Sequence, residues 1–191
     1  MKVSLRQIRG LWDEGWVLDK HSVSSVYRGP GPHDFDTIRT EVGEATFQLK
    51  YRQDWLQAKP LAQAIADNIY PKLSQVGLIV PMPASSQRAR QPVTEVANEL
   101  GAIVKIPVFS NVLMKATTGK SLKDLSTKDE KIEAIGDSFS LNDEISNIGK
   151  WNVLVVDDLF HTGASMETAC KVLRGYPKIG RIYVTALTWR S

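Results

Sequence analysis

Short apolar runs alternate with stretches of helical apolar spacing along the second half of the chain. The apolar runs predict strands at 76–80, 103–109, 153–156 and 182–187. A helix is predicted from Pro92 to a stop at Gly101, and a second one carries the apolar stripe Met166, Ala169, Cys170 and Leu173. Strands that alternate with helices predict an α/β fold with a parallel sheet and flanking helices, in which ligands bind at the carboxyl ends of the strands.

The first half of the chain is less regular. Residues 1–43 hold short apolar pieces between turn-forming residues, and we interpret them as an N-terminal extension that forms a small hood. In 44–51, the apolar Ala45, Phe47, Leu49 and Tyr51 alternate with polar residues, which predicts a strand with one exposed face. A helix should begin near Pro60. The expected domains are therefore a hood at 1–43 and a core at 44–191.

The most informative segment follows the strand predicted at 153–156. Asp157 and Asp158 stand at the end of this apolar run, and small residues then open a helix. Adjacent carboxylates bind neighbouring hydroxyls or attract a hydrated divalent cation. Amides at a helix N-terminus suit a phosphate. Together they predict a ribose 5-phosphate site formed by Asp157, Asp158, Leu159, Phe160, His161, Thr162, Gly163, Ala164 and Ser165. The alternative is an ordinary β-turn-α connection with polar capping residues.

A second polar segment follows the strand at 76–80. Ser85 and Ser86 supply hydroxyls, while Arg88 and Arg90 supply charge that can bind phosphate oxygens in a bidentate fork. Both predicted strands end at the same edge of a parallel sheet, so this segment is a candidate pyrophosphate site beside the Asp pair. The alternative is a capped helix start with solvated arginines.

These residues resemble a known family. An apolar strand, two acidic residues, three variable positions and Thr-Gly-small-Ser are similar to the signature loop of type I phosphoribosyltransferases. The resemblance implies that Asp157 and Asp158 hold the ribose hydroxyls of phosphoribosyl pyrophosphate (PRPP), that 162–165 hold its 5-phosphate, and that Mg²⁺ binds at the Asp pair mainly through PRPP and water. It also implies a Rossmann-like type I phosphoribosyltransferase fold.

The arginine segment narrows the resemblance. Pro-x-Pro-x-Ser-x-x-Arg-x-Arg, read from Pro81, looks like the ComF-like phosphoribosyltransferases, which also carry a Lys-Tyr pair upstream, similar to Lys50-Tyr51. The chain departs from that family where Gln91-Pro92-Val93-Thr94 replaces Gly-Phe-Asn-Gln. It also lacks the cysteines of an N-terminal zinc ribbon. These departures bear on pyrophosphate binding and turnover more than on ribose-phosphate binding.

The stretch from Lys115 to Lys131 is rich in lysine. In the resembled family a loop in this place closes over the substrate, which would bring Lys115, Lys120 and Lys123 to the pyrophosphate; a solvated surface loop is the alternative. Thr118-Gly119-Lys120-Ser121 resembles the end of a phosphate-binding P-loop, but Met114 stands where that motif requires glycine.

Composition excludes several other classes. The chain has 191 residues, a net charge of +3 and a single cysteine, which excludes an internal disulfide or a cysteine zinc cluster. Its start lacks the apolar core of a signal peptide, and no apolar run is long enough to cross a bilayer. We therefore expect a cytoplasmic protein without membrane association. Cys170 is interpreted as core packing, His161 as facing solvent, and Trp189 either as a cover of the core or as a surface on which a nucleobase stacks.

The leading hypothesis is a phosphoribosyltransferase that binds PRPP with Mg²⁺ and transfers ribose 5-phosphate to a nitrogenous acceptor, releasing pyrophosphate. The alternative is a regulator that binds PRPP or nucleotides without turnover, linked to DNA uptake or processing as ComF-like proteins are. A homodimer is expected, because dimers are common in the resembled class. The acceptor itself is not identified, and residues 1–43 are the expected base-recognising element.

Overall fold

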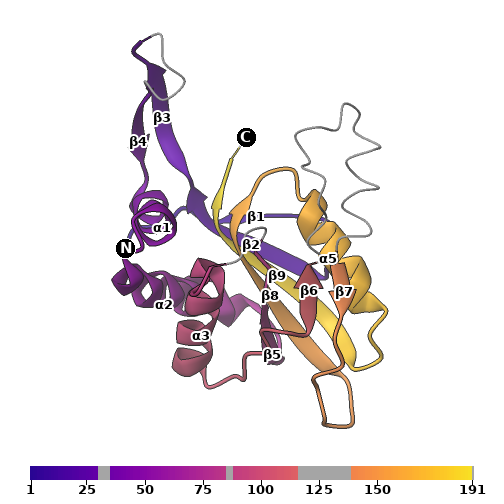
Figure 1. Ribbon diagram of the computed structural model, residues 1–191. Helices are drawn as coiled ribbons and strands as arrows, with labels where there is room; N and C mark the ends of the chain where they lie inside the picture. Colours follow the sequence, from indigo (N-terminus) through magenta and orange to yellow (C-terminus); the bar gives the residue numbers. More distant parts are fainter. Residues whose placement is uncertain (30–34, 85–87, 116–138, 191) are drawn as a thin grey trace.

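The computed structural model describes residues 1–29, 35–84, 88–115 and 139–190. Its centre is a five-stranded sheet, in which all neighbouring strands are parallel except the short first one (Figure 1). The order across the sheet is β1 (Arg6–Gln7), β2 (Glu14–Lys20), β9 (Ile179–Trp189), β8 (Trp151–Phe160) and β5 (Val76–Pro81). The expected α/β fold with a parallel sheet is confirmed.

Helices cover both faces of this sheet (Figure 1). One face carries α1 (Glu41–Tyr51), α2 (Ala58–Asn68) and α3 (Pro92–Val104), and the other carries α5 (Ala164–Arg174). Short 3₁₀ turns follow two of the helices, η1 (Trp55–Gln57) after α1 and η2 (Tyr70–Lys72) after α2. Two small antiparallel sheets complete the described structure, one of β3 (Ser22–Tyr27) with β4 (Phe35–Arg39) and one of β6 (Leu113–Lys115) with β7 (Phe139–Leu141).

The central strand β8 belongs to two cores because its side chains alternate between the faces of the sheet. Val153 and Val155 pack on the α5 face, and Leu154 and Val156 pack on the face of α1, α2 and α3. All four side chains are fully buried, and each contributes about 1.5–3 kcal/mol of hydrophobic stabilisation. The end of this strand is therefore held rigidly from both sides.

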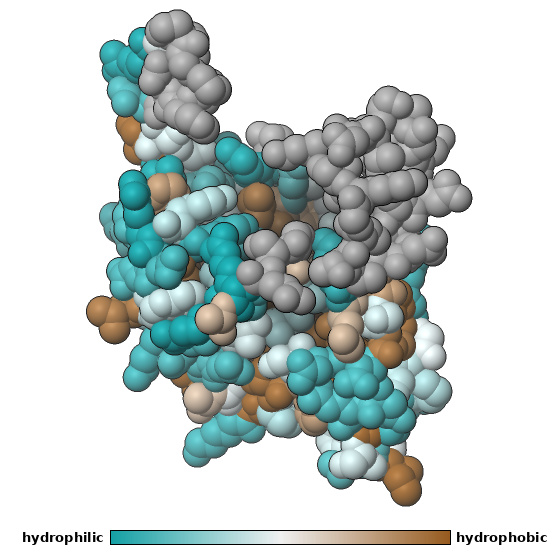
Figure 2. All heavy atoms as spheres, in the orientation of Figure 1, coloured by the Kyte–Doolittle hydropathy of each residue, from teal (hydrophilic) through white to brown (hydrophobic). Residues whose placement is uncertain are grey.

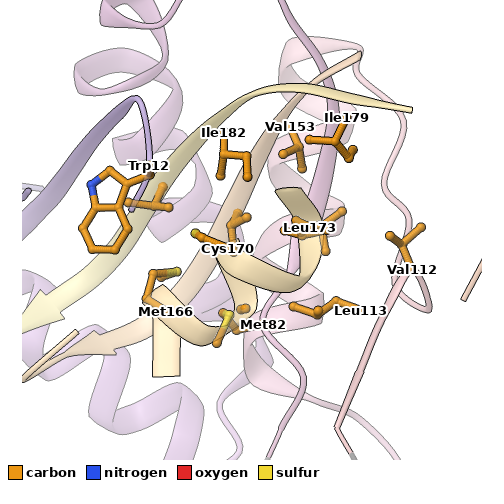
Figure 3. Close-up of a cluster of buried hydrophobic side chains, with 14 of the residues drawn as sticks. Trp12, Met82, Val112, Leu113, Val153, Met166, Cys170, Leu173, Ile179 and Ile182 are labelled. Carbon is orange, nitrogen blue, oxygen red and sulfur yellow. The ribbon is translucent and has the colours of Figure 1, made fainter. Parts of the chain in front are cut away.

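The predicted elements of the core are largely confirmed. Strands occupy the places expected at 76–80, 153–156 and 182–187, and α2 contains Pro60 near its start. The stripe of α5 is buried against the sheet, where Cys170 and Leu173 lie among Val153, Ile179 and Ile182 (Figure 3). Cys170 is a packing residue, and burial raises the pKa of its thiol to about 12.

The strand predicted at 44–51 is wrong, because these residues form most of α1. The same segment has a second apolar periodicity, in which Val42, Ala45, Thr46 and Leu49 are buried at helical spacing. Thr40 caps this helix by accepting a hydrogen bond from the amide of Gly43 at 2.9 Å. The side-chain cap and the tertiary contacts of this face select the helix over the alternating pattern.

The strand predicted at 103–109 is also wrong. Helix α3 continues past Gly101 and ends where Lys105 adopts a left-handed conformation, and only Val108 forms an isolated bridge with Ile79. Gly101 is needed for close packing: an added Cβ would lie 2.5 Å from the Val108 side chain and 2.7 Å from the Ile106 carbonyl oxygen. The glycine permits a close approach of the following segment and does not stop the helix.

The N-terminal segment contributes strands to two sheets. β1 and β2 belong to the central sheet, where β2 pairs in parallel with β9, whereas β3 and β4 form a hairpin that extends away from the body (Figure 1). The face of the molecule in Figure 2 is mostly hydrophilic, with small separate apolar areas. Among the described residues, no helix has the length and apolar character needed to cross a membrane.

Candidate functional site

The candidate site lies at the carboxyl end of β8, which continues beyond its neighbour β5. The pairing of these two strands ends at Pro81 and Val156, and the amide of Met82 then donates to the Val156 carbonyl at 2.8 Å. On its other edge β8 remains paired with β9 as far as Phe160. Asp157 and Asp158 therefore lie inside the strand rather than after it, held by β9 on one edge and open to a pocket on the other.

Because successive residues of a strand face opposite sides, the two carboxylates have different surroundings. Asp157 faces the same side of the sheet as Val155, which is the side of α5. It lines two pockets, one formed by the loop before α5 and a central one. Asp158 faces the same side of the sheet as Val156, which is the side of α1. It lines the central pocket but not the pocket of the loop. The pair thus joins two neighbouring pockets.

Asp158 forms an ion pair with Lys50 at the end of α1. The Lys50 Nζ lies 2.5 Å from Oδ2 of Asp158, and both side chains are largely buried. Burial acts to lower the pKa of Lys50, but the charge of Asp158 and its hydrogen bond outweigh burial and raise that pKa. Lys50 was not predicted as a site residue; the signal available was the Lys50-Tyr51 pair, which is similar to the pair of the ComF-like proteins.

Within the described part of the chain Asp157 forms no ion pair at contact distance, and its Oδ1 accepts a hydrogen bond from the amide of Asp158 at 2.8 Å. Burial, together with repulsion from the Asp158 carboxylate, raises the pKa of Asp157 to about 7. The Lys50 and Lys115 charges oppose this shift. A carboxyl group whose charged form is destabilised in this way is a favourable place for a ligand that brings a cation or hydroxyl donors.

The position of Lys50 depends on the start of its helix. The Thr40 hydroxyl donates to the Lys20 carbonyl at 2.6 Å, which ties α1 to the end of β2. Gly43 lies against the His21 backbone so closely that an added Cβ would be 1.9 Å from the His21 carbonyl oxygen. A larger residue would push α1 away from the sheet, and with it the lysine that reaches Asp158.

The loop from Leu159 to Ser165 surrounds a small pocket of about 110 Å³. Gly163 caps α5 with a φ of 81°, a left-handed conformation that favours glycine, and its added Cβ would approach the Phe160 ring to 3.1 Å. The first amides of α5 have no partner within the helix and suit an anion. His161 and Thr162 are exposed, as expected for His161, whereas Gly163 is buried.

The central pocket has a volume of about 280 Å³ and brings together residues from four parts of the chain. Its polar lining includes Asp157, Asp158 and Ser165 from the β8–α5 segment, Lys50 from α1, Lys115 from β6, and Arg88 and Gln91 before α3. Burial lowers the pKa of Lys115, although the charge of Asp157 acts in the opposite direction. The pocket therefore places two carboxylates opposite three cationic side chains.

Both predicted arginines line a pocket beside the central one, but only Arg88 also lines the central pocket. Arg88 lines the central pocket, and its Nη1 donates to the Lys50 carbonyl at 2.9 Å. Arg90 turns to a neighbouring pocket, where it pairs with Glu95 at 2.5 Å and covers the Trp55 ring. Ser85, Ser86 and the lysine-rich stretch with Lys120 and Lys123 lie outside the described residues, as does Thr118-Gly119-Lys120-Ser121.

Two other residues, His21 and Trp189, lie near this edge. The Nδ1 of His21 is 3.3 Å from the Thr188 hydroxyl, which donates to the Asp158 carbonyl at 3.0 Å. Burial lowers the pKa of His21, helped by the charges of Arg190 and Arg39. The Trp189 ring is covered by Arg6 at 4.1 Å and by Lys20 at 5.1 Å, so it stacks with side chains of the N-terminal segment.

The donor set limits how a metal ion would bind. Among the described residues there is no cluster of three or more acidic, histidine or cysteine side chains arranged for a metal. Asp157 and Asp158 offer oxygen atoms, which Mg²⁺ prefers, but Mg²⁺ needs near-octahedral coordination. The site fits a metal ion that arrives with phosphate and water oxygens and does not fit one held by the protein alone.

No protein-family model and no curated protein matches the sequence. Solved structures do match the fold. Adenine phosphoribosyltransferase from Trypanosoma brucei, solved in complex with AMP, pyrophosphate and ribose 5-phosphate, is 14% identical, with 99% of this chain and 76% of that chain covered and a TM-score of 0.53. The enzyme from Leishmania tarentolae is 10% identical over 98% and 95% of the two chains, with a TM-score of 0.49.

The likeness to the Trypanosoma brucei structure shows the fold, which is that of the type I phosphoribosyltransferases. This confirms the fold that the Asp-Asp loop led us to expect. At 14% identity the likeness carries no residue's role from one chain to the other, so the function rests on the geometry of this chain's own side chains.

Proposed function

We propose that the protein is a phosphoribosyltransferase of the ComF-like kind, acting in the cytoplasm. It would bind PRPP with Mg²⁺ and transfer ribose 5-phosphate to a nitrogenous acceptor. The observation that carries the proposal is the pair of carboxylates at the open end of β8, with Asp157 lining the pocket of the helix N-terminal loop and Asp158 paired with Lys50.

The binding mode follows from the neighbouring pockets. The 5-phosphate would take the loop of 162–165, where amides at the start of α5 and the Thr162 and Ser165 hydroxyls favour an anion. Asp157 and Asp158 would accept hydrogen bonds from the ribose hydroxyls. Arg88 and Lys115, which line the central pocket together with the carboxylates, would then hold the pyrophosphate group.

The reaction itself is a displacement at C1 of the ribose. The acceptor nitrogen forms a bond to C1, the bond between C1 and the pyrophosphate oxygen breaks, and its electron pair leaves with pyrophosphate. The proton of the acceptor nitrogen passes to solvent. The side chains act by position and charge: the Asp pair fixes the ribose, and the cations of the central pocket stabilise the negative charge that develops on the leaving group.

Mg²⁺ would bind at Asp157 and Asp158 through water and the oxygens of PRPP, and would supply charge compensation for pyrophosphate. Ionised Asp157 is the form that favours such a complex. Because the pKa of Asp157 is raised to about 7, a bound cation would bring it back toward its usual range.

The test is the release of pyrophosphate from PRPP and Mg²⁺ in the presence of a panel of nitrogenous bases and ring acids. The proposal predicts release with at least one acceptor by the wild-type protein and none by the Asp157→Asn, Asp158→Asn double variant. The matched control is Asp36→Asn with Asp67→Asn, which removes two carboxylates outside the pockets and should keep activity.

A folded double variant that releases pyrophosphate at the wild-type rate would contradict the assignment of the Asp pair. If the wild-type protein binds PRPP but releases no pyrophosphate with any acceptor, the alternative of a non-catalytic PRPP-binding regulator replaces the enzyme.

A further inference from the structure

A second pocket adjoins the central one on the side of α1 and η1. It has a volume of about 530 Å³ and shares Lys50 and Arg88 with the central pocket. We refer to it as the aromatic pocket. None of the seven residues that line it in the described part of the chain is acidic, so these walls combine two aromatic side chains with three cationic ones. Its remaining lining residues are Tyr51, Gln53, Trp55, Ala89 and Arg90.

The binding mode proposed above does not use the aromatic pocket. PRPP would place its 5-phosphate in the pocket of 159–165, here called the loop pocket, its ribose at the Asp pair, and its pyrophosphate at Arg88 and Lys115. The aromatic pocket borders the central one at Arg88, on the side of the leaving group. A group that lies in it would therefore be joined to the diphosphate and not to C1 of the ribose.

The aromatic side chains offer surfaces for a planar ring. The guanidinium of Arg90 lies 4.4 Å from the centre of the Trp55 ring, and Tyr51 beside it in the lining is 60% exposed. A stacked guanidinium plane and an exposed aromatic ring are both surfaces on which nucleobases stack. Pyrophosphate alone would gain nothing from them, so the pocket favours a diphosphate that carries a ring.

The turn between α1 and η1 presents Gln53 and Trp55 to the pocket in a fixed arrangement. Gln53 has a φ of 57°, a left-handed conformation that residues other than glycine rarely adopt. The carboxylate of Asp54 accepts hydrogen bonds from the amide of Leu56 at 3.2 Å and from Nε2 of Gln57 at 2.8 Å. This acidic side chain is thus held in η1 and does not line the pocket, where the Gln53 amide can bind the polar edge of a base.

The arginines suit a diphosphate that passes from the central pocket into the aromatic one. Arg88 donates one hydrogen bond to the Lys50 carbonyl at 2.9 Å and forms no ion pair within the ranges that the structure describes. Its other N–H donors are those that bind phosphate oxygens in a fork. Arg90 is paired with Glu95, which lies outside the lining of the pocket, and adds a second, partly neutralised guanidinium.

We propose that the aromatic pocket makes the protein a receptor for a nucleoside diphosphate, whose diphosphate takes the pyrophosphate subsite at Arg88 and whose base stacks on the side chains of Tyr51, Trp55 and Arg90. This inference rests on the proposed function for the place of that subsite. The ligand competes with PRPP, because both need Arg88, and it leaves the loop pocket and the Asp pair free. Its orientation is opposite to that of a nucleotide product, whose phosphate would lie in the loop of 162–165.

The experiment compares nucleoside diphosphates with methyl diphosphate, which carries the same charged group without a base. ADP, GDP, UDP and CDP are titrated calorimetrically into the full-length protein with Mg²⁺, after saturation with ribose 5-phosphate to fill the loop pocket and the Asp pair. Because stacking of one base contributes about 1–3 kcal/mol, at least one of the four should bind roughly fivefold to hundredfold more tightly than methyl diphosphate. The inference is overturned if none does, or if ribose 5-phosphate prevents their binding.

Two variants assign the preference to the aromatic pocket. Trp55→Leu should remove most of the advantage of the nucleoside diphosphate, and Arg90→Gln should weaken its binding roughly tenfold. Neither should change the affinity for methyl diphosphate by more than about twofold, because Arg88 remains. Lys72→Gln is the matched control, since it removes a cation that lies 4.9 Å from the Trp16 ring outside these pockets. Wild-type affinity for the nucleoside diphosphate in both folded variants would contradict the inference.

PRPP is titrated in parallel to separate this inference from the function on which it rests. Excess PRPP should displace the nucleoside diphosphate, and a nucleoside diphosphate that stays bound would refute the shared subsite. If PRPP binds and no nucleoside diphosphate is preferred over methyl diphosphate, this inference fails while the phosphoribosyltransferase proposal stands. If PRPP does not bind, the proposed function fails, and this inference fails with it.

Discussion

The Lys50 ammonium lies 2.5 Å from the Asp158 carboxylate, and this ion pair joins the end of α1 to the end of β8. The backbone of the same lysine accepts the hydrogen bond from Arg88. One residue therefore connects the carboxylate pair to the arginine segment. Its charge balances Asp158 in the free protein, and it adds to the positive charge that an incoming PRPP meets.

Replacing Lys50 by Met should weaken PRPP binding more than it destabilises the fold. Loss of one charge-assisted contact predicts a fall in affinity of roughly tenfold to a hundredfold, because the ligand loses a cation and Asp158 loses its partner. Calorimetric titration with Mg²⁺ and PRPP measures the change. Lys59→Met, on the exposed side of α2, is the control. Equal affinities of wild type and Lys50→Met would remove Lys50 from the site.

The raised pKa of Asp157 predicts a dependence of stability on pH. With a folded pKa of about 7 against a usual value of 3.8, the folded state binds more protons than the unfolded chain between these values. The contribution of Asp157 to the free energy of unfolding should therefore fall as the pH rises from about 4 to 7 and stay constant above that. Denaturant unfolding of wild type and Asp157→Asn across this range measures it; curves that stay parallel would contradict the raised pKa.

Gly163→Ala tests the loop before α5. The left-handed φ of 81° and the approach of an added Cβ to the Phe160 ring at 3.1 Å both oppose a side chain, so a loss of about 1–2 kcal/mol is expected. Ribose 5-phosphate affinity should fall as well, because the amides that face the ligand move. Gly175→Ala, at the other end of α5 with an ordinary φ of −73°, should change neither quantity. A fully stable Gly163→Ala variant would argue against this loop conformation.

Gly43→Ala tests whether the position of α1 matters to the site. An added Cβ would lie 1.9 Å from the His21 carbonyl oxygen, and relief of this clash moves the helix at a cost of about 1–3 kcal/mol. PRPP affinity should decrease although Gly43 lies far from the ligand along α1, since Lys50 moves with the helix. Unfolding and PRPP titration of the same variant measure both effects; lower stability with unchanged affinity would separate α1 from the site.

The sequence predicted those parts of the candidate site whose polar residues lie within one continuous segment of clear local structure. The run from Val153 to Ser165 is a buried strand, an acidic pair and a helix start in sequence order, and the structure has all three. Lys50 was missed because its role depends on α1, a helix whose alternating apolar residues predicted a strand. The pairing of Lys50 with Asp158 arises from tertiary packing, which no local pattern records.

In the arginine segment, too, tertiary packing decides what the local sequence pattern could not predict. Its sequence grouped Arg88 and Arg90 as equivalent phosphate ligands, whereas in the structure only Arg88 lines the central pocket of the Asp pair, and Arg90 is held by Glu95 and Trp55. The place of β2 in the central sheet was also not predicted, because its short apolar pieces become a strand only through pairing with β9.

The most direct test of the central claim is calorimetric titration of the wild-type protein with PRPP in the presence and absence of Mg²⁺, with ribose 5-phosphate as the comparison. The proposed site predicts saturable binding of PRPP that strengthens when Mg²⁺ is present, and weaker binding of ribose 5-phosphate, which meets the loop and the Asp pair but not the cations of the central pocket. Absence of binding by both ligands would contradict the account.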